Sequence, residues 1–456
     1  MIRSLHRLAA ARRAGLWAGL FLAAVITFGA SADLSTDRAQ LARECDALIA
    51  RSVHRPYGKA WTDATPAPKP KGGAQGVDLR PGFTPAAAVA LYWAGEQLGE
   101  PKFKDAALQA ARGLCAAERG TGAVPAHPIF LPNVAGGREE VSLVADRAPT
   151  CAALAVWLTF TEETADKEPV FHSCSLRALN WLLHQQAANG AWPQSDPPAT
   201  QPKDAVRILR LDDGDWRNCT LTMLLAHDVL QDRRFAKSAE KSDEFLLRLR
   251  VGEISIKARH LWSTAYGMDA VPTSRIPEFP AGVDTLATRK AMETLLASAL
   301  VLDIPPPRPE EERATPTTAL ADAASDIPKL PKYDNRWLRR YDFDVDATHA
   351  PPPSTPVGFE TIAQIPSAAQ RIGSWGLDHL LPLIDELEKS GGDGVTRALS
   401  ANGFTLHQRF VAAIVGLTDQ TFATDEPWPN TAEKTDDASR RIWQLIVKIK
   451  QEELKS

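Results

Sequence analysis

The chain has 456 residues, of which 44% are hydrophobic and 24% are charged, proportions that are ordinary for a globular protein with an apolar core. Its formal net charge of −4 argues against a nucleic-acid partner and against an anionic membrane surface, because both need concentrated positive charge. The five cysteines include no CxxC pair. We expect them to be small buried apolar residues, with one disulfide among them as the alternative.

Residues 1–32 have the three parts of a secretory signal peptide. Four arginines precede an apolar stretch over 14–29, and Ala30-Ser31-Ala32 matches an A-x-A cleavage site. Cleavage would remove four positive charges and no acid, which takes the formal charge from −4 to −8. The mature protein is therefore predicted to be secreted or periplasmic and not associated with a membrane. An uncleaved anchor is the alternative, although the apolar run is short for a membrane span.

Helical patterns dominate the rest of the chain, and strand signals are few. Residues 33–76 are predicted to hold a short helix and a linker rich in Pro, Lys and Gly, whereas residues 77–303 form the helical core. Residues 304–332 are rich in Pro and Ala and are predicted to be a linker or long loop. Residues 333–456 are predicted to complete the core with further helices.

An internal repeat organises this core. The series Phe103, Leu108, Leu114 and Gly122-Ala123-Val124-Pro125 recurs 68 residues later as Phe171, Leu176, Leu182 and Gly190-Ala191-Trp192-Pro193. A period of this size in a chain rich in Ala and Leu indicates stacked helical hairpins. Each Gly-Ala-x-Pro loop should then lie at the same end of the stack, where a site is usually built. The predicted fold class is mostly α, an α/α toroid or barrel of helical hairpins with long Pro-rich loops.

Two loops at that end carry chemistry. In the segment 189–194, Trp192 is suited to stacking on a sugar ring and Gln194 to bonding a hydroxyl, although a well-capped helix with a packed Trp is the alternative. Farther along, Asp212, Asp213 and Asp215 fall within four residues at a helix start. One Asp suffices for capping, and crowded carboxylates on a Gly-containing turn suit Ca²⁺. Asp146 opens the preceding hairpin, so these carboxylates are predicted to converge on one rim.

With these motifs in place, residues 146–280 resemble the family-10 pectate lyases. Asp146 and Thr150 match the first and last positions of that family's Asp-Asn-Gly-Ala-Thr motif, and 189–194 match its Asn-Gly-Gly-Trp-Pro-Gln motif with Ala191 in place of one Gly. The turn 211–215 resembles the family's acidic turn in place and charge. Three later matches are Trp262, the Arg-x-x-Glu segment from Arg275 to Glu278, and Arg371 at the position of the catalytic Arg.

This resemblance implies an exported polysaccharide lyase that cleaves a uronate polymer such as pectate by Ca²⁺-assisted β-elimination, acting as a monomer on an acidic polysaccharide. Arg371 would be the base, and Asp213 and Asp215 would ligate Ca²⁺. The implied substrate-binding residues are Asp146, Trp192, Gln194, Arg217, Arg275 and Glu278. Two alternatives remain: a non-catalytic glycan-binding or scaffold protein on the same toroid, and a toroid resembling the terpene cyclases and prenyltransferases.

Overall fold

The computed structural model describes residues 34–55, 58–61, 75–118, 120, 122–126, 129–130, 146–164, 168–193, 208–251, 259–272, 282–304, 315–330, 332–333, 335–341, 372–423 and 437–455. The predicted leader lies outside these residues, as do four predicted site residues: Gln194, Arg275, Glu278 and Arg371. The described part of the chain is mostly helical, as the sequence predicts. None of its helices is both long enough and apolar enough to cross a membrane.

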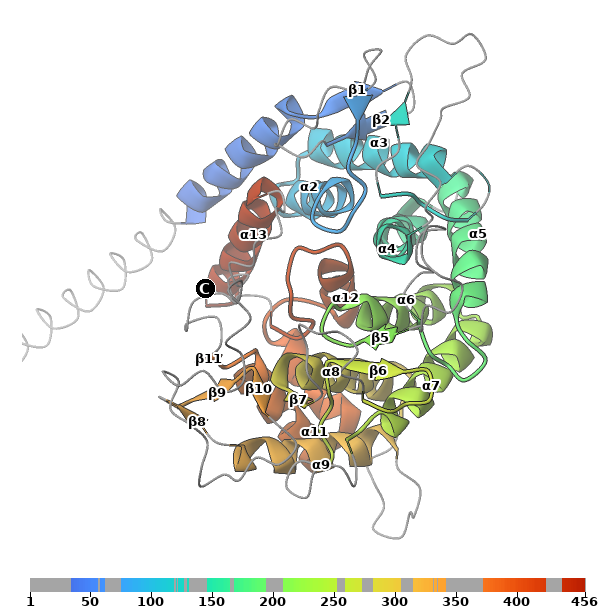
Figure 1. The fold of residues 1–456 in the computed structure, drawn as a ribbon. Helices are drawn as coiled ribbons and strands as arrows, with labels where there is room; N and C mark the ends of the chain where they lie inside the picture. Colours follow the sequence, from blue (N-terminus) through green and yellow to red (C-terminus); the bar gives the residue numbers. More distant parts are fainter. Residues whose placement is uncertain are drawn as a thin grey trace, which may run out of the picture.

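Consecutive helices form hairpins that lie side by side along a curve (Figure 1). The first helix of each hairpin belongs to an inner row, which contains α2 (Thr84–Leu98), α4 (Arg147–Thr164), α6 (Asp215–Leu230) and α8 (Thr285–Val301). The second helix belongs to an outer row, which contains α3 (Pro101–Glu118), α5 (Pro169–Gln185), α7 (Arg233–Arg248) and α9 (Pro316–Asp326). The inner helices also contact one another in order, α2 with α4, α4 with α6, and α6 with α8.

The two rows differ in sequence pattern for a physical reason. Helix α4 is buried continuously over 151–160, and α8 over 287–299, because inner helices are surrounded by other helices. Helix α7 buries only one face, which Phe235, Ala239, Ser242 and Leu246 form at helical spacing. An apolar stripe with a polar opposite face is typical of a helix with one side in solvent, whereas a helix that is apolar all round is buried.

The C-terminal helices close on this double row. Helix α13 (Asp437–Lys455) packs on α2, and α11 (Leu377–Ser400) packs on α8 and α9. Helix α12 (Leu406–Ile414) contacts α2, α4 and α6 from the inner side of the curve (Figure 1). The segment 415–423 after α12 therefore reaches the inner helices. At the other end of the chain, residues 34–50 form a helix before the first strand.

The two glycines of the repeat occupy equivalent positions. Gly122 has φ +88° and Gly190 has φ +92°, values that L side chains rarely adopt. A Cβ on Gly122 would lie 2.4 Å from the Arg177 carbonyl oxygen, and one on Gly190 would lie 2.0 Å from the Lys241 carbonyl oxygen. Each loop thus packs against the outer helix of the following hairpin. The prediction that both loops sit at one end of successive hairpins is confirmed.

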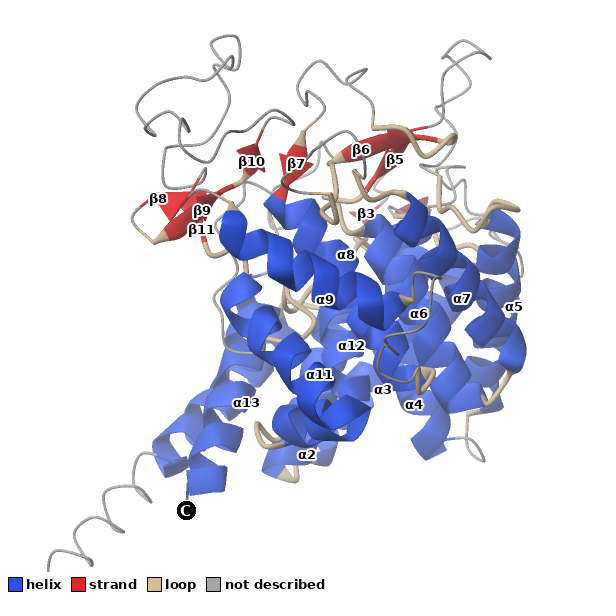
Figure 2. Ribbon diagram, turned by 90° about the horizontal axis from the view of Figure 1, so that it is seen from below, coloured by secondary structure: helices blue, strands red, loops and turns tan. Residues whose placement is uncertain are grey.

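Short antiparallel strand pairs complete the described structure, and most of them lie at one end of the helices (Figure 2). They pair β1 (Val53–Arg55) with β2 (Gly58–Ala60), β3 (Gln75–Gly76) with β4 (Ile129–Phe130), β5 (Ile208–Arg210) with β6 (Ala265–Gly267), β7 (Val283–Asp284) with β10 (Arg340–Tyr341), and β9 (Arg336–Leu338) with both β8 (Lys332–Tyr333) and β11 (Ile372–Gly373). Strand β7 runs directly into α8, and β5 precedes α6 by one short turn. The strands therefore hold the end at which the inner helices begin.

One predicted boundary is wrong. The segment 304–332, expected as a linker or loop, contains α9 and the short 3₁₀ helix η2 (Ile327–Lys329). Thr315 caps α9 through a reciprocal capping box with Thr318, and Pro316 takes the first helical position, where its missing N–H costs no bond. Flanking prolines gave the segment the composition of a loop, although its centre carries both a start signal and the apolar residues Ala319, Leu320 and Ala323.

Candidate functional site

The starts of α4 and α6 bring three carboxylates together. Arg147 and Asp215 stand 68 residues apart, one repeat, and the Arg147 Nη2 lies 2.9 Å from the Asp215 Oδ2. Asp146 precedes Arg147 and is half-buried; burial and then the charge of Asp215 raise the pKa of its carboxyl. The backbone N–H of Asp215 donates to the Asp213 Oδ1 at 3.0 Å. We call Asp146, Asp213 and Asp215 the carboxylate rim.

Asp213 has the most perturbed environment of the three. Desolvation by the surrounding protein, followed by the charges of Asp215 and Asp212, raises its pKa to about 6, against the smaller opposing effects of the Asp215 N–H and Lys290. Its side chain is nevertheless exposed to solvent. A carboxyl that is hemmed in by protein and still accessible can exchange protons with a ligand near neutral pH. Gly214, with φ +86°, makes the turn that presents it.

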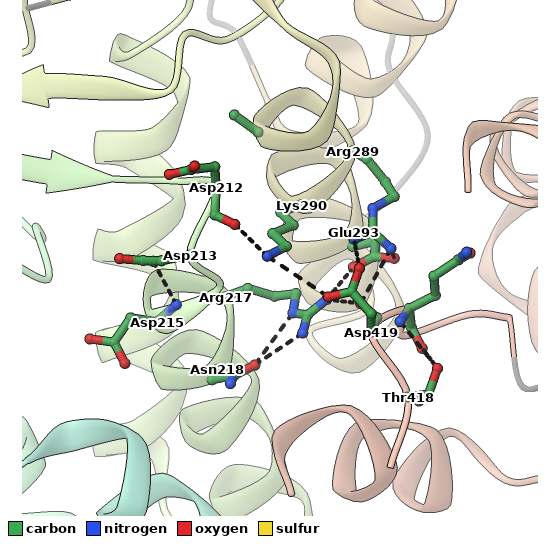
Figure 3. A network of polar contacts seen from close by, with 12 residues as sticks. Asp212, Asp213, Asp215, Arg217, Asn218, Arg289, Lys290, Glu293, Thr418 and Asp419 are labelled. Atoms are coloured by element: carbon green, nitrogen blue, oxygen red, sulfur yellow. Dashed lines mark hydrogen bonds and ion pairs between the residues drawn. The ribbon is translucent and has the colours of Figure 1, made fainter. Parts of the chain in front are cut away.

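Beneath the rim lies a second group of charges, drawn in Figure 3. Arg217 donates from Nη1 to the Glu293 Oε2 at 2.9 Å and to the Asp419 carbonyl at 2.6 Å. Arg289 donates from Nη2 to the Asp419 Oδ2 at 2.6 Å. The Lys290 Nζ donates to the Asp212 carbonyl at 2.5 Å and lies 3.9 Å from the Asp419 Oδ1. We call Arg217, Arg289, Lys290, Glu293 and Asp419 the buried ion layer.

This layer draws on three parts of the chain: α6, α8 and the segment after α12. At most 7% of the Arg217, Arg289, Lys290 and Glu293 side chains is exposed, and 19% of the Asp419 side chain. Burial alone would raise the pKa of Asp419, but Arg289, Lys290 and Arg217 outweigh it and lower the pKa to about 2. Burial lowers the pKa of Lys290. Three cations meet two carboxylates here, so the layer is charge-matched to within one positive charge.

Asp212 is the member of the acidic run that faces inward. Its carboxylate accepts from Arg210 at 3.1 and 3.0 Å and from the Arg339 Nη2 at 3.0 Å, and it is buried. The two arginine side chains keep 26% and 32% of their surface exposed. The charge of Asp213 also acts on Arg210 and helps to raise its pKa. Arg210 and Arg339 are therefore partly accessible cations that converge on Asp212, and Arg210 also interacts with the charge of Asp213.

Two predicted roles need correction. Trp192 was expected to stack on a sugar, but only 3% of it is exposed, and it belongs to the main hydrophobic core. Arg217 was expected to bind a substrate carboxylate, but it is committed to Glu293 and the Asp419 carbonyl. Both residues therefore have structural roles, because their side chains are buried beneath the loop or turn in which the motif lies. The neighbouring Arg210 and Arg339 occupy the accessible positions.

The donor set at the rim does not form a complete metal site. Among the described residues, no group of three or more His, Cys, Asp or Glu side chains is arranged to hold a metal ion. One oxygen of Asp215 is already bonded to Arg147, and one of Asp213 accepts the Asp215 N–H. Ca²⁺ prefers six to eight oxygen ligands. Calcium at Asp213 and Asp215 therefore stays a prediction from sequence, and no step is assigned to it.

Five important residues were not predicted from the sequence: Arg210, Arg289, Lys290, Glu293 and Asp419. A signal for the middle three was present. Arg289, Lys290 and Glu293 are charged residues in an otherwise apolar helix, and charged groups buried within a core are almost always paired. Their partner Asp419 is 130 residues from Arg289, so its identity had no local signal.

No protein-family model matches the chain, and no curated protein matches it in sequence. Several solved structures resemble it, among them the following two. One is a mutant family 10 polysaccharide lyase from Cellvibrio cellulosa in complex with trigalacturonic acid: identity is 15%, the match covers 56% of this chain and 84% of that chain, and the TM-score is 0.35. The other is cellobiose 2-epimerase from Spirochaeta thermophila: identity is 12%, the match covers 93% and 98%, and the TM-score is 0.45. Both are carbohydrate-processing enzymes.

Proposed function

We propose that the protein is an exported α/α-toroid enzyme that cleaves a uronate-containing polysaccharide by β-elimination at the carboxylate rim. The observation that carries the proposal is Asp213, an exposed carboxyl with a pKa of about 6, next to Asp212, on which the partly exposed guanidinium groups of Arg210 and Arg339 converge. Abstraction of a proton next to a substrate carboxylate requires a base and, close to it, guanidinium groups that bind the carboxylate. The substrate class follows from the charge of those cations.

In this reaction a base removes the C5 proton of a uronate, and the bond from C4 to the glycosidic oxygen breaks without addition of water. Asp213 in its ionised form takes the C5 proton, since a base with a pKa near the working pH is the most effective. Arg210 and Arg339 bind the uronate carboxylate, onto which negative charge moves as the proton leaves. The buried ion layer holds the Asp213 turn in place through the bond from Lys290 to the Asp212 carbonyl.

The experiment uses the full chain with polygalacturonate, a methylated pectin and a neutral polysaccharide such as cellulose. Elimination creates an unsaturated product that absorbs ultraviolet light, whereas hydrolysis creates only new reducing ends. We expect the absorbing product from polygalacturonate and none from cellulose. Repeating the assay with EDTA separates Asp213 acting as a base, which keeps its activity, from the calcium site predicted by sequence, which loses it. Reducing ends without the absorbing product would exclude elimination.

A second candidate is non-catalytic glycan binding, which was left open by the sequence. It is favoured by Arg210 and Arg339, whose partly exposed guanidinium groups can bind a uronate carboxylate without any catalytic step. This candidate expects saturable binding of oligogalacturonate by calorimetry with no product after prolonged incubation. The enzyme proposal expects product under the same conditions, so one incubation distinguishes the two.

A further inference from the structure

The structure places four of the five cysteines in two facing pairs. The Cys151 Sγ on α4 lies 3.9 Å from the Cys219 Sγ on α6, and both residues are fully buried. On the outer row, Cys115 on α3 and Cys174 on α5 each stand three residues before Glu118 and Arg177, which are hydrogen-bonded across the same two helices, so the two cysteines face each other. Cys45, on the helix over 34–50, belongs to neither pair. None of these residues takes part in the proposed catalytic chemistry.

The repeat explains why the inner pair faces. Cys151 and Cys219 are 68 residues apart, the same separation that pairs Arg147 with Asp215 one turn earlier on the same two helices. Equivalent positions on successive inner helices therefore lie side by side, and α4 and α6 are in direct contact. A disulfide needs sulfur atoms about 2.05 Å apart. Closing the bridge therefore requires the two sulfur atoms to approach by about 1.9 Å from their separation of 3.9 Å.

The outer pair has a second feature that suits thiol chemistry. The Arg177 Nη2 lies 3.2 Å from the Cys174 Sγ, and Arg177 is itself held by three hydrogen bonds to the Glu118 carboxylate. The hydrogen bond from Cys115, with Arg177 contributing further, lowers the pKa of Cys174 despite the opposing effect of burial. A thiolate beside a guanidinium is the reactive form in disulfide exchange. Cys115 is only half-buried, so this pair has the more accessible edge.

We propose that Cys151–Cys219 and Cys115–Cys174 are redox modification sites that form two disulfides and bind the second hairpin covalently to its neighbours. Each bridge forms by thiol–disulfide exchange with a small-molecule disulfide such as oxidised glutathione. One cysteine thiolate attacks the oxidant and releases one reduced thiol; the partner cysteine, on losing its proton, displaces the second. Two protein thiols are oxidised by two electrons, and one disulfide is reduced to two thiols. The inner pair forms during folding, because the folded protein shields it.

The test counts free thiols. The full chain is unfolded in denaturant with a reductant present and is then refolded in a mixture of oxidised and reduced glutathione. The remaining free thiols are alkylated in denaturant. We expect one alkylated cysteine of the five in the chain, Cys45. Peptide mapping without reduction should link Cys115 to Cys174 and Cys151 to Cys219. Five free thiols in refolded protein, or bridges between other cysteines, would overturn the proposal. A single bridge overturns it for the pair that stays reduced.

Three matched variants make the count specific. Cys45→Ala should leave no free thiol, whereas Cys151→Ala and Cys115→Ala should each leave two, because each frees one partner. Circular dichroism confirms that each variant has refolded, so a change in thiol count is not read from unfolded protein. Oxidising the already folded, reduced protein should close Cys115–Cys174 at least tenfold faster than Cys151–Cys219. Equal rates would contradict the shielding of the inner pair.

Discussion

The carboxylate rim and the buried ion layer lie within one helical turn of each other on α6. The pKa of a carboxyl is raised at the rim and lowered in the ion layer. In the ion layer, Asp419 is surrounded by Arg217, Arg289 and Lys290, and its pKa falls to about 2. At the rim, desolvation of Asp213 and the charge of Asp215 outweigh the opposing effects of the Asp215 N–H and Lys290, and the pKa of Asp213 rises to about 6. Buried charges in proteins are paired, because an isolated charge is costly to desolvate. Charge left unbalanced at an exposed position is therefore the better indicator of a ligand site.

The most direct test of this difference is to remove the Asp213 carboxylate alone. Asp213→Asn should lower the turnover of polygalacturonate by about 10²–10⁴-fold, the usual contribution of a general base. Asp232→Asn is the matched control, since Asp232 also precedes a helix and its side chain caps that helix outside the site. It should keep the parental rate. An Asp213→Asn protein that cleaves substrate at the parental rate would remove Asp213 from the mechanism.

Disrupting the ion layer should instead damage the fold. Asp419→Ala leaves Arg289 and Lys290 buried without their carboxylate, which typically costs about 3–5 kcal/mol of unfolding free energy. Asp385→Ala removes an exposed carboxylate paired with Lys389 and should change stability by less than about 0.5 kcal/mol. Urea unfolding monitored by circular dichroism measures both. Similar values for the two variants would show that burial of the layer carries little energy.

The accessible arginines should affect substrate binding more than folding. Arg210→Lys and Arg339→Lys keep the positive charge but lose the forked geometry that matches a carboxylate. We expect KM for polygalacturonate to rise about ten- to a hundredfold, because a hydrogen bond to a charged group is worth about 1.5–3 kcal/mol. Arg234→Lys, at the start of α7, serves as the control. A fall in kcat with unchanged KM would move these arginines from substrate binding to another role.

Asp213 and Asp419 should also make the stability of the protein depend on pH in opposite directions. The folded pKa of Asp213 is raised, so the stability it adds is present below its unfolded pKa of about 3.9 and is lost as pH rises through about 6. The folded pKa of Asp419 is lowered, so its contribution is present above about pH 3.9 and is lost as pH falls through about 2. The Asp213→Asn variant has no such titration. It should therefore become more stable relative to the parent as pH rises from 4 to 6, about the interval between the unfolded and folded pKa values of Asp213.

Urea titrations of parent and variant across this interval give the difference directly. A constant difference from pH 4 to 6, about the range set by the two pKa values of Asp213, would show that Asp213 titrates normally in the folded state. Asp232→Asn again provides the comparison, because the Arg234 side chain and then the Arg234 backbone N–H lower the pKa of Asp232 by hydrogen bonding.

Sequence pattern anticipated what depends on local spacing. The period of 68 residues predicted the equivalence of Gly122 and Gly190, and the same period later explained the Arg147–Asp215 pair. The acidic turn at the start of α6 was also found. Local spacing could not show how deeply an individual side chain is buried. Trp192 and Arg217 follow informative motifs but point inward, and the partner of Arg289 lies 130 residues away.

The position of Asp419 has a consequence for how the chain is completed. Synthesis proceeds from the N-terminus, and domains generally begin to fold as they emerge. Arg217 and Arg289 are made long before Asp419, which lies 202 and 130 residues later. Until that segment arrives, Arg217 and Arg289 have Glu293 as their carboxylate partner but not Asp419, so the layer carries a larger excess of positive charge. We therefore expect the inner row to reach its final packing only after the C-terminal part of the chain has docked against it.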